Sequence, residues 1–395
     1  MTNQNSGAAT GGKSSESNAG AHRGGGRRLL PFLIVVSTIF GSGTWLVCAT
    51  WQYFWGRPAS ATWQIVPFVL SAAFILSLLA GMRFSSLVVR LTYTVSAVWI
   101  ALLNFCLFAA IACWIVGGLS NEFRLNLDRQ FIGATLYGFA IVVCCYGFLN
   151  ANWLRVTRVT VALPHLPPAW DGREVVLMSD LHLGNVRGAA FTRRVVNKVR
   201  SLKPHAVFVC GDLFDGPKAD YDAQVAPCRE LTAPAGVYYI TGNHEEFTDR
   251  GKFISAVKGT GLRVLNNEKV IVEGLQIVGV HDGEAMEPAR LRKTLEDAAI
   301  DPRRASVLLA HRPGNLSIVE AAGISLQVSG HTHKGQMWPW PWVAARVHGP
   351  FVYGLNRFEK LLVLTSSGAG TWGPPVRVGT RSEIVLIRLE NAAPS

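Results

Sequence analysis

The segment Asp180-Leu181-His182 places two metal-binding residue types two positions apart, one residue after the apolar run at 175–178. If that run is a β-strand, its period of two puts the Asp180 carboxylate and the His182 imidazole on one face. A carboxylate and an imidazole that face the same way form half of a metal site. The other half must then come from elsewhere in the chain.

Four further segments repeat this arrangement, in which an apolar run ends at a metal-binding side chain. They are Gly211-Asp212-Leu213-Phe214-Asp215, Gly242-Asn243-His244-Glu245, His311, and Gly330-His331-Thr332-His333. In layered α/β proteins, sites form at the carboxyl ends of strands, so these side chains can converge. Aspartate, histidine and an asparagine carbonyl suit Mn, Fe, Zn or Co. One aspartate can bridge two such ions about 3.5–4 Å apart, which is the geometry of two-metal phosphoester hydrolysis.

In this order, Asp-x-His, Gly-Asp-x-x-Asp, Gly-Asn-His-Glu, a lone His and Gly-His-x-His resemble the calcineurin-like metallophosphoesterase superfamily over about residues 155–390. The segments 330–336 and 365–377 are similar to its bacterial YaeI/YkuE-like branch. The resemblance implies two divalent or trivalent metal ions as cofactors, and a metal-activated hydroxide that attacks phosphorus. It implies that one metal is held by Asp180, His182, Asp212 and His333, and the other by Asp212, Asn243, His311 and His331.

Two further roles are implied by the same resemblance. His244 matches the catalytic histidine of the superfamily, which contacts the phosphate and protonates or stabilises the leaving oxygen. Asp215 is expected to orient that histidine or a metal ligand. The alternative for Asp215 is an ordinary turn-forming aspartate.

The elements that must position these residues follow residue 154, where strand-like and helix-like patterns alternate. Strands are expected at 155–161, 175–179, 206–210, 237–241, 263–266, 269–273, 275–280, 306–310, 326–329, 361–365 and 383–389, and helices at 189–202, 253–260 and 291–299. This order predicts a layered α/β domain. The resemblance specifies a four-layer metallophosphoesterase-type sandwich, with two packed mixed β-sheets flanked by helices.

Four apolar segments precede this domain, at about 29–50, 63–81, 93–117 and 131–150, and each is long enough to cross a bilayer. They predict an all-α bundle of four transmembrane helices. The alternative is a set of buried helices in a large soluble domain. We therefore expect a disordered N-terminal tail at 1–28, a transmembrane region at 29–153 and a calcineurin-like metallophosphoesterase domain at 154–395.

Basic residues near the ends of these segments predict the orientation. They gather in the N-terminal tail at Lys13, Arg23, Arg27 and Arg28, in the second loop at Arg83 and Arg90, and after the fourth segment at Arg155 and Arg158. The first loop carries only Arg57. This bias predicts a multi-pass protein of the inner (cytoplasmic) membrane whose catalytic domain is cytoplasmic.

The net charge of +12 fits basic residues held against anionic lipid headgroups. Specific nucleic-acid readout is not expected, because the basic stretch formed by Arg193, Arg194, Lys198 and Arg200 has no interleaved aromatic residues. Five of the seven cysteines lie in the apolar segments, so no disulfide framework is implied. The sequence carries no indication of the oligomeric state.

The segment Met337-Trp338-Pro339-Trp340-Pro341-Trp342-Val343 places three tryptophans within five residues. Tryptophan is favoured at membrane–water interfaces. The segment is therefore either a core plug or a loop that enters the headgroup layer or lines a groove for a lipid tail.

Together these patterns predict a membrane-anchored phosphoesterase that hydrolyses phosphodiester or pyrophosphate bonds, with a lipid-linked phosphate among its candidate substrates. One alternative is a tethered phosphodiesterase for soluble nucleotides or nucleic acid. The other is a catalytically silent membrane scaffold, against which the complete set of ligands argues.

Overall fold

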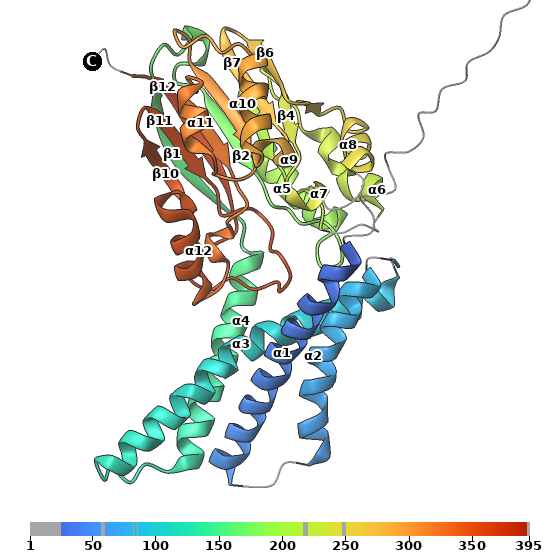
Figure 1. The fold of residues 1–395 in the computed structure, drawn as a ribbon, viewed down its shortest axis with the longest axis vertical. Coiled ribbons are helices and arrows are strands. Elements are labelled where there is room, and N and C mark those ends of the chain that lie inside the picture. The colour runs from blue at the N-terminus through green and yellow to red at the C-terminus, as the bar shows by residue number, and fades with distance from the viewer. Residues whose placement is uncertain are drawn as a thin grey trace, which may run out of the picture.

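The computed structural model describes residues 25–56, 60–81, 83–84, 86–215, 220–246 and 250–392. Four long helices form one half of the molecule, and an α/β domain sits at one end of them (Figure 1). Residues 1–24 of the predicted tail at 1–28 lie outside the described residues, and the first helix begins at Gly25. Lys13, Arg23 and Arg57 of the orientation prediction also lie outside them.

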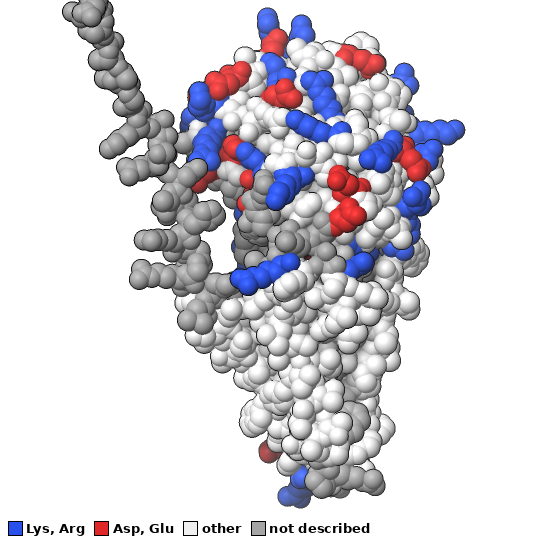
Figure 2. Space-filling view, turned by 90° about the vertical axis from the view of Figure 1, so that its right-hand side faces the viewer, with Lys and Arg blue, Asp and Glu red and all other residues white. Residues whose placement is uncertain are grey.

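Each of the four helices contains a stretch long and apolar enough to cross a membrane. They are α1 (Gly25–Trp55), α2 (Ala61–Gly81), α3 (Leu87–Glu122) and α4 (Arg129–Asn152). Large apolar side chains are exposed along them, including Val88 (73%) and Leu149 (70%), so the alternative of helices buried in a soluble domain is wrong. On the face shown in Figure 2, charged side chains are scattered over the α/β half but are nearly absent from the helical half except at its far end. The start of α1 and the end of α4 both lie beside the α/β domain (Figure 1).

The α/β domain contains two six-stranded mixed sheets, with the orders β1-β12-β2-β3-β4-β5 and β10-β11-β9-β8-β7-β6. The strands are β1 (Arg155–Leu163), β2 (Glu174–Met178), β3 (Ala206–Cys210), β4 (Val237–Ile240), β5 (Arg263–Val264), β6 (Glu268–Val272), β7 (Leu275–Val280), β8 (Ser306–Ala310), β9 (Leu326–Ser329), β10 (Gly354–Phe358), β11 (Leu361–Thr365) and β12 (Glu383–Asn391). Strands β2, β3, β4 and β5 are parallel to one another, and so are β7, β8, β9 and β11.

Alternating side chains divide the core into layers. In β2, Val175 and Leu177 pack between the two sheets, whereas Val176 and Met178 pack on the outer face. Helices α5 (Ala189–Ser201) and α8 (Arg250–Lys258) cover the outer face of the first sheet, and α10 (Pro288–Asp297) and α11 (Leu316–Ala321) cover that of the second. The remaining α-helices of this domain are α6 (Tyr221–Val225), α7 (Asn243–Glu246), α9 (Asp282–Ala285) and α12 (Trp340–His348). The predicted four-layer sandwich is confirmed.

The tryptophan-rich segment forms a helix that the sequence did not predict. Its two prolines suggested a loop, yet Pro341 occupies the first turn of α12, where a helix tolerates proline. Trp340 (48% exposed) and Trp342 (67% exposed) face outward, so the core-plug alternative is wrong.

The end of α4 binds directly to the α/β domain. Asn150 donates from Nδ2 to the carbonyl oxygens of Arg377 (2.8 Å) and Thr380 (2.9 Å). The backbone N–H of Arg377 donates to the carbonyl oxygen of Gly147 (2.9 Å). A Cβ atom at Gly147 would lie 2.5 Å from Cγ1 of Val376, so this close approach requires glycine.

Replacing Gly147 with valine should therefore destabilise the full-length protein. Overpacking a close contact costs about 1–3 kcal/mol, and we expect a lower thermal midpoint in detergent. Gly138→Val is the matched control, because it makes the same change on α4 where a Cβ would meet no atom within 4 Å. Equal destabilisation by the two variants would contradict this prediction.

Candidate metal centre

The seven predicted metal ligands lie together at the carboxyl ends of five strands. Asp180 and His182 follow β2, Asp212 follows β3, Asn243 follows β4, His311 follows β8, and His331 and His333 follow β9. These ends face the helical half of the molecule, since Arg187 in the loop after β2 donates to the carbonyl oxygen of Ala151 at the end of α4 (3.1 Å). The topology therefore brings both sheets to a single site near the membrane helices.

The first group of side chains is formed by Asp180, His182 and His333, whose ligand atoms lie within 4.8 Å of one another. The two Nε2 atoms of His182 and His333 are 3.0 Å apart. Oδ1 of Asp180 lies 3.6 Å from Nε2 of His333, and Oδ2 of Asp212 lies 3.8 Å from Nε2 of His182. All four side chains are buried.

The second group is formed by Asp212, His311 and His331, again within 4.8 Å. Oδ2 of Asp212 lies 3.1 Å from Nε2 of His311. Oδ1 of Asn243 lies 3.2 Å from the same nitrogen. Asp212 contacts both groups, which is the position that a bridging ligand requires.

Buried carboxylates determine the charge of this cluster. Burial opposes ionisation of Asp212, but the attraction of His311 keeps the pKa of that carboxyl well below its usual value. Burial likewise opposes charge on His311, yet Asp212 raises the pKa of this imidazole to about 10. Burial and the neighbouring His182 lower the pKa of His333, which is therefore neutral, as a metal-binding imidazole must be.

Five of the seven candidate ligands have a left-handed backbone. They are Asp180 (φ 55°), His182 (φ 49°), Asp212 (φ 49°), His331 (φ 69°) and His333 (φ 48°). This conformation costs an L-residue roughly 1–2 kcal/mol, and it persists where the surrounding structure enforces it, often at functional sites. The prediction that strand periodicity places Asp180 and His182 on one face is wrong, because β2 ends at Met178. The conformation of the loop after β2 directs both side chains into the cluster instead.

Glycines leave the space that these turns need. A Cβ atom at Gly242 would clash with Oδ1 of Asp212, and one at Gly330 would clash with Oδ2 of Asp180. Each glycine directly precedes a candidate ligand, Asn243 or His331, so the backbone can pass close to a neighbouring carboxylate.

Contacts behind the ligands orient them. Nδ1 of His311 lies 2.8 Å from the carbonyl oxygen of Cys210 and donates to it, which directs Nε2 at the cluster. A metal ion would displace the proton that Nε2 carries at neutral pH. Nδ1 of His182 is buried and lies 3.4 Å from Oδ1 of Asp215, within ion-pair range but longer than an ordinary hydrogen bond. Oδ1 of Asp215 also lies 3.3 Å from Nδ1 of His244. Asp215 thus lies between two histidines of the site.

His244 stands at the edge of the cluster with its side chain 15% exposed, and its Nε2 is 4.0 Å from Oδ2 of Asp212. Burial opposes its protonation, but the contact with Asp215 and the charge of Asp212 raise its pKa to about 9. A histidine that keeps its proton at neutral pH and reaches solvent can donate that proton to a bound ligand.

Glu245 is a buried residue of the site to which the sequence assigned no role. Its carboxylate accepts from the backbone N–H groups of Asp212 (3.0 Å), Phe214 (3.0 Å) and Gly242 (2.7 Å). It therefore ties together the loops that follow β3 and β4. The sequence feature that could have identified Glu245 is its position next to His244 in the Gly-Asn-His-Glu segment.

Arg377 is a second such residue. It is completely buried and donates to the carbonyl oxygens of Ser367 (2.6 Å) and Gly370 (2.7 Å), and its Nη2 lies 3.2 Å from Nδ1 of His333. Because it packs behind His333 and its backbone binds Gly147 of α4, it connects the metal cluster to the membrane helices.

Arg377→Lys should weaken metal binding, because a lysine cannot make the several directed contacts of a guanidinium. Loss of a group that orients a ligand typically lowers metal affinity about 10–100-fold. Metal content after dialysis, measured by elemental analysis, checks this expectation. Arg357→Lys on the exposed side of β10 is the control, and equal metal retention by both variants would contradict the assignment.

The arrangement fits two metal ions. Two imidazole nitrogens on one tetrahedral ion, with bonds of 2.0–2.1 Å, lie roughly 3.3 Å apart, and the buried Nε2 atoms of His182 and His333 are 3.0 Å apart. The donor set of imidazole, carboxylate and amide oxygen suits Mn, Fe, Zn or Co. Two stacked mixed sheets that carry this cluster at their strand ends define a metallophosphoesterase domain.

Comparison with known proteins supports this class. The family described as Calcineurin-like phosphoesterase matches residues 173–335. A metallophosphoesterase of Helicobacter pylori strain J99 is 30% identical over 276 residues, which cover 69% of this chain and 71% of that protein. The chain belongs to the calcineurin-like phosphoesterase family.

Two other relatives bear on the membrane region and on the branch of the family. A bovine protein named "Transmembrane protein with metallophosphoesterase domain" is 33% identical over 272 residues, covering 64% of this chain and 61% of the bovine protein. The metallophosphoesterase YkuE of Bacillus subtilis is 27% identical over 284 residues, covering 67% of this chain and 97% of YkuE. The resemblance to the YkuE-like branch is confirmed. With the four apolar helices, the first relative indicates a multi-pass membrane protein.

Proposed function

We propose that this protein is a membrane-anchored phosphoesterase that hydrolyses phosphodiester or pyrophosphate bonds in a substrate presented at the bilayer, with a lipid-linked phosphate as the substrate class. In this proposal the chain divides into a membrane region ending near residue 153 and a catalytic domain from residue 154. The metal ligands are the seven residues Asp180, His182, Asp212, Asn243, His311, His331 and His333.

The observation that carries the membrane part of the proposal is the contact between the metal-binding loop and α3. The chain runs from His333 into α12, and Asn104 of α3 donates from Nδ2 to the carbonyl oxygen of Trp338 (3.2 Å). Nε1 of Trp340 donates to Oδ1 of the same asparagine (3.2 Å). The ring of Trp338 packs on Phe108 of α3 and on the exposed Trp342, with ring centroids 4.8 and 5.7 Å apart, so the exposed apolar surface of the helices continues onto α12. A substrate reaching the metal cluster would meet this surface.

The residues divide the chemistry between them. When bound, the two ions would supply a water of lowered pKa and positive charge for the phosphoryl oxygens. Asp212 is the residue that would bind both ions. His244 keeps a proton for the leaving oxygen, and Asp215 fixes the His244 ring through Nδ1.

A substrate panel on the full-length protein in nanodiscs tests the proposal. We expect faster hydrolysis of a bilayer-embedded lipid pyrophosphate or phosphodiester than of its water-soluble headgroup analogue. Equal activity on cyclic nucleotides or DNA, with or without lipid, would instead favour a tethered soluble-substrate phosphodiesterase. A protein that holds two metals yet hydrolyses no phosphoester would be a scaffold.

We further propose that the catalytic domain faces the cytoplasm of a bacterial inner membrane. Arg83 and Arg90, near the α2–α3 turn, and Arg155 and Arg158 after α4 lie at the same end of the helices as the domain. Arg124 and Arg129 at the opposite end are accompanied by Glu122 and Asp128. A periplasm-dependent reporter fused to the C-terminus should be inactive, and an active one would reverse the orientation.

A further inference from the structure

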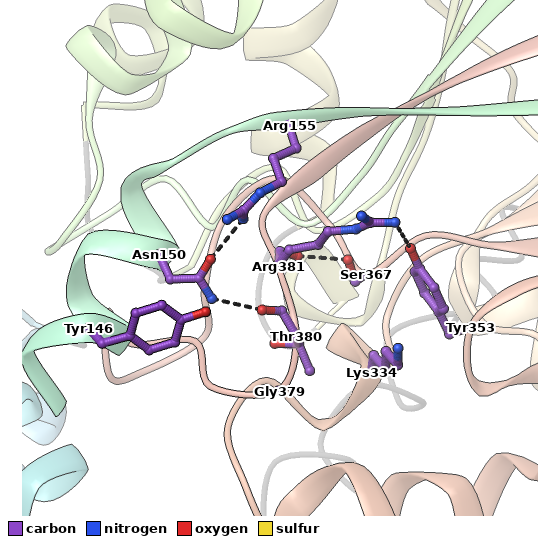
Figure 3. Close-up of a pocket in the computed structure, with 9 residues that line it drawn as sticks. All are labelled: Tyr146, Asn150, Arg155, Lys334, Tyr353, Ser367, Gly379, Thr380 and Arg381. Atoms are coloured by element: carbon purple, nitrogen blue, oxygen red, sulfur yellow. Dashed lines mark hydrogen bonds between the residues drawn. The ribbon is translucent and has the colours of Figure 1, made fainter. Parts of the chain in front are cut away.

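A cavity of about 460 Å³ lies where α4 meets the α/β domain, outside the metal cluster. It is lined by Tyr146, Asn150, Arg155, Lys334, Tyr353, Ser367, Gly379, Thr380 and Arg381, none of which is a candidate metal ligand. Figure 3 shows Asn150 and Arg155 on one side, at the junction of α4 and β1, and Lys334 and Tyr353 across from them. The buried Arg377 separates the cavity from the metal cluster, because it contacts both the lining residue Ser367 and the ligand His333.

The lining contains three cationic side chains and no acidic one. Nε of Arg381 lies 3.4 Å from Oε2 of the buried Glu383, which offsets one of these charges. Among the described residues, neither Arg155 nor Lys334 has a carboxylate within ion-pair distance. The guanidinium of Arg155 donates to Oδ1 of Asn150 (2.8 Å) and lies over the ring of Trp153 (4.1 Å). The ammonium of Lys334 lies over the ring of Tyr353 (4.4 Å). The cavity therefore offers unneutralised positive charge and spare N–H donors, which suit a phosphate group.

An exposed apolar stripe on α4 leads into the cavity. Phe139, Val142, Tyr146 and Leu149 are spaced by three, four and three residues, so they share one helix face. They are 66%, 65%, 55% and 70% exposed, respectively. Tyr146 belongs to both the stripe and the cavity lining. Because α4 is long and apolar enough to cross a membrane, this face meets acyl chains, and the cavity lies at the headgroup level above them.

We propose that this cavity binds the anionic headgroup of a phospholipid whose acyl chains lie along the exposed face of α4. The apolar stripe and the cationic cavity match the two parts of such a molecule. A free phosphate would use the cavity but not the stripe. The inference does not depend on the proposed catalytic function, since its site shares no residue with the candidate metal ligands.

Native mass spectrometry of the detergent-solubilised full-length protein tests it, with phosphatidylglycerol as the probe and phosphatidylcholine as the neutral comparison. We expect one phosphatidylglycerol to bind preferentially to the wild-type protein. Arg155→Gln combined with Lys334→Gln should weaken that binding roughly 30-fold, from about 1 kcal/mol for each basic residue near an anionic lipid. Arg290→Gln combined with Lys293→Gln removes the same two residue types from the exposed face of α10 and should leave binding unchanged.

Other results of these measurements would contradict the proposal. Equal binding of the two lipids to the wild-type protein, or an unchanged preference in the cavity variant, would overturn it. Displacement of phosphatidylglycerol by excess inorganic phosphate would show a site for soluble anions and would overturn the lipid assignment. Thermal midpoints confirm that the variants are folded. If the double variant is not folded, the single variant Lys334→Gln decides, with an expected loss of roughly fivefold.

Discussion

Asp212→Asn should abolish phosphoester hydrolysis and lower the bound metal to less than two ions per chain. Asp212 contacts both groups of candidate ligands, with Oδ2 3.1 Å from Nε2 of His311 and 3.8 Å from Nε2 of His182. Removing one charge from a buried ionic cluster costs about 3–5 kcal/mol, or roughly 10²–10⁴ in rate when it is lost from the transition state. The measurements are the turnover of a generic phosphodiester and the metal content of the same sample.

A thermal measurement separates loss of metal from loss of fold. A metal that binds the native state raises the thermal midpoint, so added metal should stabilise the wild-type protein but not Asp212→Asn. Asp297→Asn, which removes an exposed carboxylate on α10, is the matched control. An Asp212→Asn protein with two tightly held metals and full turnover would exclude Asp212 as the bridge.

His244→Asn should lower turnover while the metal content stays close to that of the wild type. The proton of His244 is stabilised by Asp215, with Nδ1 and Oδ1 3.3 Å apart, and its raised pKa, about 9, keeps it charged at neutral pH. General acid catalysis contributes typically about 10²–10⁴-fold. We expect a loss of this size for a substrate with an alkoxide leaving group.

The leaving group distinguishes an acid from a merely structural residue. The p-nitrophenolate leaving group departs without protonation. The hydrolysis of a p-nitrophenyl ester should therefore fall far less in His244→Asn than the hydrolysis of an alkyl ester. His165→Asn, at an exposed turn, controls for the change of residue type. Equal losses on both esters, or loss of the metals, would make His244 a ligand or a structural residue instead of the acid.

The order and chemistry of the site could be predicted from the sequence because each part depends on local pattern. Apolar runs that end at Asp180, Asp212, Asn243, His311 and His331 specify buried strands followed by ligands. Carboxyl ends of parallel strands lie at one edge of a sheet, so the convergence within each sheet follows from the pattern. The meeting of the two sheet edges at one site is decided by the tertiary structure. The four apolar helices could also be predicted from the sequence, because a bilayer requires a certain length and a low polarity of any helix that crosses it.

Other features depend on contacts between distant segments, which no local pattern encodes. The left-handed backbone at Asp180 and His182 is imposed by packing, whereas strand periodicity alone would have continued β2. The helical conformation of Trp340–His348 could not be predicted, because Pro339 and Pro341 at its start suggested a loop. These positions are set by tertiary contacts that outweigh local preference.

Asp180 and His182, on their own, specified half of a metal site from residue type and spacing. Only the tertiary structure decided that Arg377 supports His333 from behind, that Glu245 joins two loops, and that α4 is bound to the loop behind the cluster through Asn150. The physical reason is that a ligand's identity is a property of one residue. Its orientation, its charge and its distance from the membrane are properties of buried contacts between distant segments, such as Asn150 and Thr380, which are 230 residues apart.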